Sequence, residues 1–245
     1  MRRHLIDLLK KFEFYQASSS EMFGDSVDED GFQRESTPMT PVSPYGAAKL
    51  FGFNIVKSYR KAYGLHASNG ILFNHESPRR GETFVTRKIS RGVSRIKEGI
   101  QEKLTLGNLD AKRDWGYAPE FVEGMWKIMQ QKHPDDFVLA TNETHTVKEF
   151  VKLAFQTVDM DWKKFVKIDK KLFRLLEVNA LNGDYSKARK KIGWKPKINF
   201  KELVKIMVSK DLERWTRWKK GENFPWDANN YINEKKVLFR RYNKI

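Results

Sequence analysis

The sequence predicts an α/β protein in which helices cover both faces of a parallel sheet. Segments with strand-like and helix-like hydrophobic patterns alternate along the chain, and the helix-like segments carry start and stop signals. The composition permits such a core, because 40% of the 245 residues are hydrophobic and 13% are aromatic. These values argue against general disorder, and no repeat of fixed period indicates a solenoid.

The strongest element is a long helix that begins at Pro44. Ser43 can cap it, proline suits a first helical position, and Gly64 can end it. Thr146 and Glu149 form a capping box that opens a later helix. In chain order we expect a helix over residues 1–11, a strand over 12–17, an exposed loop over 25–44, the long helix over 44–63, a strand over 66–73, a basic helix over 84–99, a strand over 136–140, a helix from 147 and a last helix over about 200–218.

Charge and cysteine content restrict the function classes. The 47 Lys and Arg residues exceed the 31 Asp and Glu residues by 16, so a phosphate-bearing or polyanionic partner has to be considered. The absence of cysteine excludes disulfides, thiolate metal sites and cysteine nucleophiles, and we predict no metal site. The first eleven residues lack the apolar core of a signal peptide, and no stretch approaches the roughly 20 apolar residues that cross a bilayer. We therefore expect a cytoplasmic chain that does not enter a membrane.

Two pairs of residues have spacings that suit chemistry. Ser19 and Glu21 are two residues apart at a strand exit, so they project to the same side and could address one ligand. Taken alone, the two residues are better interpreted as ordinary solvated loop residues. Tyr45 and Lys49 lie at i and i+4 of the long helix, where the ammonium group can stabilise a phenolate. A tyrosine that acts as a general base at neutral pH needs such a neighbour, although this spacing also arises by chance.

Four longer strings together resemble a known family. They are SSSE at 18–21, SPYGAAK at 43–49, GILFNHESPRRG at 70–81 and GNLDAKRDWG at 107–116. They resemble GDP-mannose 4,6-dehydratases, which belong to the extended short-chain dehydrogenase/reductase proteins, and the similarity extends from Phe14 to about Lys210. The resemblance implies a partial Rossmann-type parallel sheet with its N-terminal strands missing, and a smaller α/β substrate domain. It places the NADP-binding part at 1–75 and 112–144, the substrate domain at 76–111 and 145–218, and a basic tail at 219–245.

The resemblance also implies an activity. Tyr45 would take the proton of the C4 hydroxyl of GDP-mannose while hydride passes to NADP, and Lys49 would lower its pKa and hold the nicotinamide ribose. Glu21 would remove the C5 proton, water would leave from C6, and hydride would return there. Ser19, where the family usually has threonine, would donate a hydrogen bond to the oxygen at C4. The product would be GDP-4-keto-6-deoxymannose.

Binding residues follow from the same resemblance. It assigns His75 and Arg80 to the cofactor, and it assigns Asn74, Lys88, Arg113, Arg174 and Glu177 to the nucleotide sugar. Planar arginine donors suit a diphosphate. Outside this motif context, a structural role is the better interpretation of His75, and a solvated surface charge is the better interpretation of Lys88.

One part of a Rossmann domain is missing from the sequence. No G-x-x-G-x-x-G turn is present, although that turn faces the pyrophosphate at a helix N-terminus. A sheet without its first strands exposes an edge and invites association. Two hypotheses follow: a lyase whose cofactor half comes from a second chain, or a non-catalytic truncated remnant or subunit. A nucleic-acid binder ranks last because no recognition motif accompanies the charge. Relatives usually form homo-oligomers.

Overall fold

A parallel three-stranded sheet lies at the centre of the protein. The computed structural model describes residues 2–173, 178 and 181–222, and the structural statements below concern these residues. Strands β1 (Phe14–Ser19), β2 (Ala67–Leu72) and β7 (Asp136–Leu139) pair in the order β1-β2-β7, all parallel. Helices separate the strands along the chain, so the predicted α/β class is confirmed.

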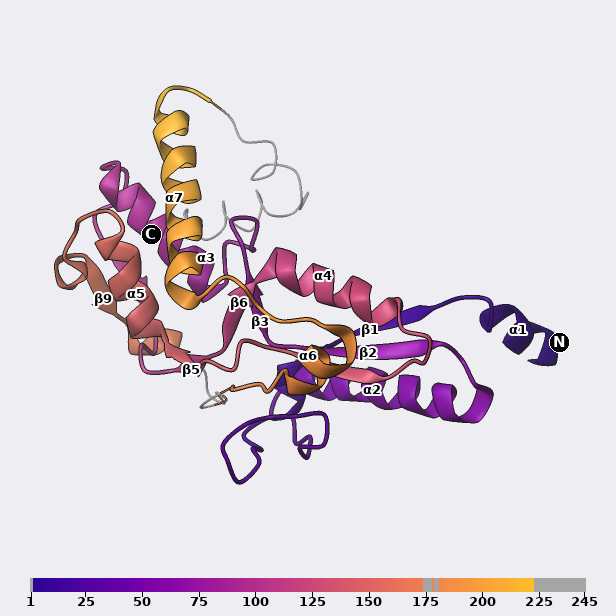
Figure 1. Ribbon diagram of the computed structural model, residues 1–245. Helices are drawn as coiled ribbons and strands as arrows, with labels where there is room; N and C mark the ends of the chain where they lie inside the picture. Colours follow the sequence, from indigo (N-terminus) through magenta and orange to yellow (C-terminus); the bar gives the residue numbers. More distant parts are fainter. Residues whose placement is uncertain (1, 174–177, 179–180, 223–245) are drawn as a thin grey trace.

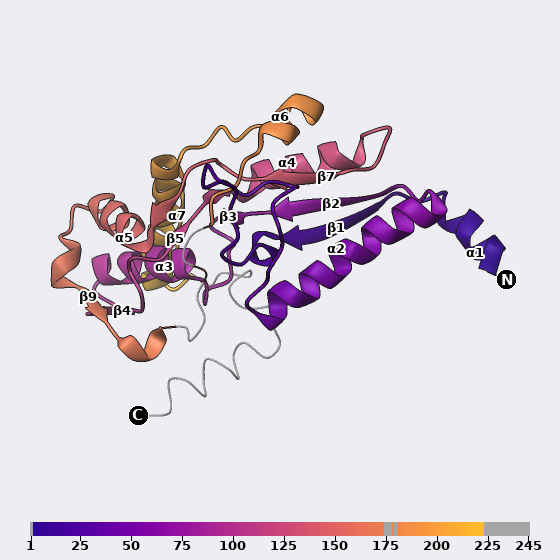
Figure 2. The same ribbon diagram turned by 90° about the horizontal axis from the view of Figure 1, so that it is seen from below.

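Helices cover both faces of this sheet (Figures 1 and 2). Helix α2 (Pro44–Tyr63) lies on one face and α4 (Ala118–Met129) on the other. As predicted, the Ser43 hydroxyl accepts a hydrogen bond from the amide of Gly46 at 3.0 Å, and Gly64 ends α2 with a φ of 63°. Helix α4 was not predicted from the sequence. Helix α1 (Arg2–Leu9) precedes β1, and α6 (Ser186–Ile192) packs near β7.

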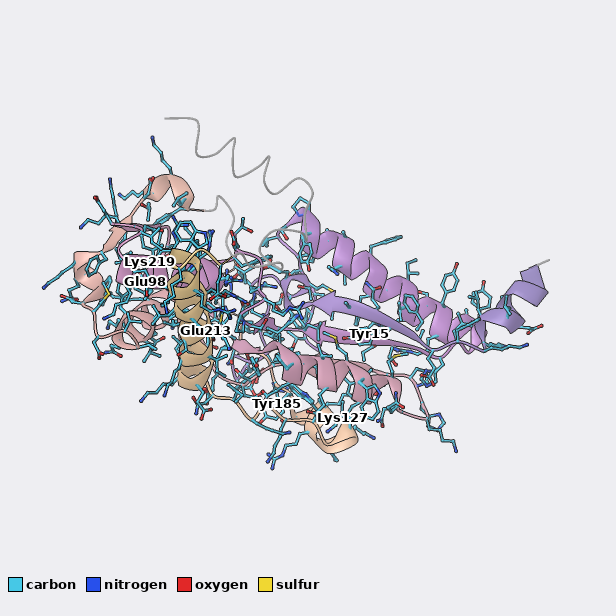
Figure 3. The ribbon with its side chains drawn as sticks, turned by 90° about the horizontal axis from the view of Figure 1, so that it is seen from above. Tyr15, Glu98, Lys127, Tyr185, Glu213 and Lys219 are labelled. Carbon is cyan, nitrogen blue, oxygen red and sulfur yellow. The ribbon has the colours of Figure 1, made fainter. Side chains whose placement is uncertain are left out.

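A second group of elements lies beside the sheet and is built on three helices, α3 (Val85–Lys97), α5 (Val147–Gln156) and α7 (Phe200–Lys219). At one end of this group the Lys219 ammonium lies 3.2 Å from the Glu98 carboxylate, and both residues are labelled in Figure 3. The remaining strands pair as β3 (Asn74–Glu76) with β6 (Trp115–Tyr117), β4 (Leu104–Leu106) with β9 (Val166–Ile168) and β5 (Lys112–Arg113) with β8 (His145–Thr146); the 3-10 helices are η1 (Ser20–Met22), η2 (Trp162–Lys164) and η3 (Lys170–Leu172).

The buried apolar side chains form two clusters. One joins the sheet to α2, α4 and α6, and the other joins α3, α5 and α7. The segment around residues 178–194 contributes Val178, Leu181 and Trp194 to the cluster at the sheet. The family resemblance placed this segment in the substrate domain. The domain boundaries remain a prediction.

A buried carboxylate fixes α3 against α7. Asp211 is fully buried on α7 and accepts hydrogen bonds from Arg87 at 3.0 Å, from Ser90 at 2.6 Å and from Arg214 at 2.8 Å. Arg87 also donates to the carbonyl of Arg80 at 3.0 Å. Buried charges are costly unless they are paired, and here the paired groups of α3 and α7 join the two helices.

The segment 25–44 differs from the exposed loop that the sequence predicts. Gln33 and Thr37 are buried within it, and Gln33 forms a β-bridge with Gly183. The Arg34 guanidinium donates to the Asp184 carboxylate at 2.7 Å. These contacts join residues far apart in the sequence, so local polarity alone did not reveal them. No helix among residues 2–173, 178 and 181–222 is long and apolar enough to span a membrane.

Candidate active site

Strand β1 delivers two of the candidate catalytic residues at its carboxyl end. Ser19 is nearly buried and caps η1, where its hydroxyl oxygen accepts a hydrogen bond from the amide of Glu21 at 3.2 Å. Glu21 is half-buried in the first turn of η1. The Ser19 hydroxyl group accepts this hydrogen bond through its oxygen, so its hydrogen is still available to donate a hydrogen bond to a ligand.

The start of α2 packs directly against η1. A Cβ atom at Gly46 would lie 2.7 Å from the carbonyl oxygen of Glu21, so glycine permits this close approach. The Lys49 ammonium donates to the carbonyl of Ala17 on β1 at 2.9 Å and lies 5.6 Å from the centre of the Tyr45 ring. Tyr45 is 56% exposed. The structure therefore brings Ser19, Glu21, Tyr45 and Lys49 to one end of β1.

Asn74 and His75 follow the carboxyl end of the neighbouring strand β2. The His75 Nδ1 atom lies 2.8 Å from the carbonyl oxygen of Phe73, and its ring stacks on Phe121 of α4 with centroids 5.2 Å apart. Burial lowers the pKa of His75, which favours the neutral imidazole at neutral pH. The Oδ1 atom of Asn74 is buried and has no hydrogen-bond partner among the described residues. A buried acceptor of this kind suits a ligand that donates to it.

Arg80 is held in the loop that follows β3. Its Nε atom lies 3.2 Å from the Glu76 carboxylate, and its guanidinium lies 3.6 Å from the centre of the Phe84 ring. Glu76 also accepts a hydrogen bond from the Thr86 hydroxyl at 2.5 Å, and burial raises its pKa. These contacts limit the directions in which the Arg80 guanidinium can point.

The other candidate binding residues lie in the second group of elements. Lys88 is half-buried on α3. Arg113 on β5 is 8% exposed and donates to the carbonyl of Val178 at 2.9 Å. Arg174 and Glu177 lie outside the residues that the structure describes.

Comparison with known proteins assigns the family. The model of the family described as GDP-mannose 4,6 dehydratase matches residues 1–207. The chain belongs to the GDP-mannose 4,6-dehydratase family. "GDP-mannose 4,6 dehydratase 1" of Arabidopsis thaliana is 55% identical over 213 residues, which are 87% of this chain and 58% of that protein. The human "GDP-mannose 4,6 dehydratase" is 50% identical over 223 residues, 84% of this chain and 59% of that protein. The chain thus spans well under two thirds of these relatives.

Solved structures share the fold of this family member. RMD from Pseudomonas aeruginosa, solved with NADPH, superposes with a TM-score of 0.74 at 21% identity, covering 82% of this chain and 67% of that one. dTDP-glucose 4,6-dehydratase from Bacillus anthracis, solved with NAD, has a TM-score of 0.74 at 21% identity, with 89% and 68% covered. At this identity the likeness concerns the fold alone, and it confirms the predicted Rossmann-type class.

Asp114 is a buried acid that sequence reasoning did not single out in this family member. It lies within the string RDWG, directly after Arg113, and is fully buried. Its carboxylate accepts hydrogen bonds from the Thr141 amide at 2.9 Å, from the Thr141 hydroxyl at 2.8 Å and from the Gly183 amide at 3.4 Å. Asp114 therefore fixes the chain after β7 against β6. Asp114 could have been identified from the sequence, because it directly follows Arg113 in the motif at 107–116.

Asp114 makes the stability of the protein depend on pH. Burial raises its pKa to about 7 despite the three donors. The folded state then holds a proton that the unfolded state releases, so we expect the free energy of unfolding to fall as the pH rises from about 4 to 7. The slope due to this one group is at most about 1.4 kcal/mol per pH unit. Urea unfolding of the wild type and of Asp114→Asn across this range measures it, and parallel profiles would contradict the assignment.

Proposed function

We propose that this chain carries the catalytic residues of a GDP-mannose 4,6-dehydratase, a lyase that converts GDP-mannose to GDP-4-keto-6-deoxymannose with NADP. The observation that supports it most directly is the packing of α2 on η1, which places Tyr45 and Lys49 beside Ser19 and Glu21. The names of the curated relatives support the same substrate.

In this proposal Tyr45 acts on the C4 hydroxyl of the mannose. Its phenol oxygen accepts the hydroxyl proton, and the Lys49 ammonium lies 5.6 Å from the centre of the Tyr45 ring. The Lys49 ammonium donates a hydrogen bond to the carbonyl of Ala17, which holds the ammonium in place. The Ser19 hydroxyl donates a hydrogen bond to the C4 oxygen and orients the sugar.

Glu21 performs the elimination. Once C4 is a ketone, the proton at C5 is acidic, and the Glu21 carboxylate removes it and gives this proton to the C6 hydroxyl, which leaves as water. The proton that Tyr45 took from the C4 hydroxyl then goes to C5 as C6 is reduced. The Glu21 amide donates to the Ser19 hydroxyl, so the base and the residue that orients C4 lie in one short turn. The same short turn therefore serves two neighbouring carbons of the sugar.

A nicotinamide cofactor, when bound, supplies the acceptor and donor of the hydride that moves from C4 to C6. We assign its binding to Lys49, His75 and Arg80. The neutral imidazole of His75 and the fixed guanidinium of Arg80 suit the polar groups of a dinucleotide. We favour NADP over NAD, with support from the NADPH-bound structure of RMD.

The nucleotide sugar is assigned to Asn74, Lys88 and Arg113, together with Arg174 and Glu177 outside the described residues. The unpaired Oδ1 atom of Asn74 suits a sugar hydroxyl, and the cations suit a diphosphate. We also propose a cytoplasmic location, which is supported by the absence of cysteine.

The glycine-rich turn does not occur among the 245 residues, and we propose that another polypeptide segment brings it to the site. The edge of β1 supports this, because no described strand pairs with that side of β1. The test is to mix the chain with GDP-mannose and NADP, with and without the N-terminal segment of the Arabidopsis relative, and to measure the 4-keto product. Product that needs this segment supports the proposal, and no product in either mixture favours a non-catalytic remnant.

We further propose that two copies of the chain associate through α2. Phe51, Ile55, Tyr59 and Tyr63 repeat every four residues and are all exposed, so they form one apolar stripe along the helix. We expect Phe51→Lys to weaken self-association at least about tenfold, because it buries an unpaired charge in the contact. Analytical ultracentrifugation measures this, with Val122→Lys on α4 as the control. Equal effects of the two substitutions would exclude α2 as the contact.

A further inference from the structure

A cavity of about 480 Å³ lies away from the proposed catalytic residues. It is bounded by the loop after β3, the first residues of α4 and one side of α7, and none of Ser19, Glu21, Tyr45 or Lys49 lines it. The lining residues are Ser77, Pro78, Arg79, Tyr117, Pro119, Lys210, Glu213, Arg214 and Arg217. Its volume is sufficient for one or two large side chains.

The charged groups of α7 that line this cavity already have partners. The Lys210 ammonium lies 2.7 Å from Glu213, and Arg214 donates to Asp211 at 2.8 Å and to the carbonyl of Pro78 at 2.7 Å. The facing wall carries Pro78, Tyr117 and Pro119, together with Ser77 and the exposed Arg79. An aromatic occupant fits this cavity, because it can pack on Pro78, Tyr117 and Pro119 and stack on the arginine side chains of the lining.

The chain turns back toward this cavity after α7. Gly221 has a φ of 90°, its amide bonds to the carbonyl of Trp218 at 2.9 Å, and the Glu222 amide bonds to the carbonyl of Arg217 at 3.2 Å. This is a Schellman motif. The Glu222 carboxylate then pairs with the Arg217 guanidinium at 2.6 Å, and Arg217 lines the cavity. In Figure 1 the yellow end of the described chain bends to the side of α7 on which α4 lies.

The sequence after Glu222 supplies aromatic side chains at once. It continues Asn223-Phe224-Pro225-Trp226, within residues 223–245, which lie outside the described part. Four extended residues reach about 14 Å, and the helix from Arg217 back to Lys210 is about 10 Å long. Trp226 can therefore reach every residue of α7 that lines the cavity.

We propose that the segment beginning at Asn223 folds back on its own chain and packs Phe224 and Trp226 into this cavity. The occupant would join α7 to the loop that precedes Arg80 and to the start of α4. The C-terminal segment would thus hold together the sheet and the helices of the second group. This inference does not depend on the proposed catalytic function.

A cysteine pair tests the contact directly, because the chain has no cysteine of its own. Ser77→Cys lines the cavity, and Asp227→Cys follows Trp226. We expect the double variant of the full chain to form a disulfide within one chain, detected on non-reducing gels and by peptide mass mapping. The control pair is Ser186→Cys on exposed α6 with Asp227→Cys. Equal crosslinking of both pairs, no crosslinking, or a disulfide between two chains would each overturn the proposal.

A stability measurement gives independent support. Trp226→Ala removes one aromatic anchor, and we expect it to lower the thermal midpoint by about 4–8 °C. Phe239→Ala, farther along the same segment, is the matched control and should change the midpoint by less than about 2 °C. An unchanged midpoint in Trp226→Ala, or an equal fall in both variants, would contradict the packing of Trp226 in the cavity.

Discussion

Replacing Tyr45 with phenylalanine is expected to lower the rate of GDP-mannose dehydration about 10³-fold. The substitution removes the phenol oxygen that would accept the C4 proton and leaves the ring in place, 5.6 Å from the Lys49 ammonium. Tyr45 is 56% exposed, so folding should be unaffected. The KM for GDP-mannose should change little, because the lost interaction belongs to the transition state.

The measurement is the rate of 4-keto product formation with the N-terminal segment of the Arabidopsis relative present. Tyr63→Phe is the matched control, because Tyr63 lies on the same helix and is also exposed. The control should keep its activity. A Tyr45→Phe variant with more than about a tenth of the wild-type rate would show that another group takes the proton.

Replacing Asp211 with alanine is expected to lower the free energy of unfolding by about 3–5 kcal/mol. The change leaves Arg87 and Arg214 without their shared carboxylate, and these side chains are only 4% and 9% exposed. Removing one partner of a buried ion pair costs more than the pair itself contributes, because a buried charge then lacks compensation. Urea unfolding at neutral pH measures the loss.

Two further variants distinguish the loss of the buried ion network from the loss of any single surface charge. Glu213→Ala, also on α7, removes an exposed carboxylate that pairs with Lys210, and it should cost less than about 1 kcal/mol. The triple variant Arg87→Met/Asp211→Leu/Arg214→Met, which removes all three charges of the network, should be more stable than Asp211→Ala. If Asp211→Ala and Glu213→Ala cost the same, the network contributes nothing beyond a surface pair.

Local signals in the sequence predicted most of the helices. The long helix begins and ends where Ser43 and Gly64 indicate, and the capping box of Thr146 and Glu149 opens α5. The strand expected at 12–17 is present two residues later, as β1. Helix α4 was missed, although Pro119 stands in its first turn. The short strands β3 to β6, β8 and β9 were also missed, because two or three residues carry no readable period.

The sequence by itself determined the family and the candidate catalytic set, because Ser19, Glu21, Tyr45 and Lys49 lie in motifs a few residues long. Only the tertiary structure decided how these motifs meet. The approach of α2 to η1 at Gly46, the buried acids Asp114 and Asp211, and the anchoring of residues 25–44 on Gly183 all join segments far apart in the chain. Helix caps and strand patterns are read from neighbouring residues, whereas pKa shifts and paired charges arise from burial by distant ones.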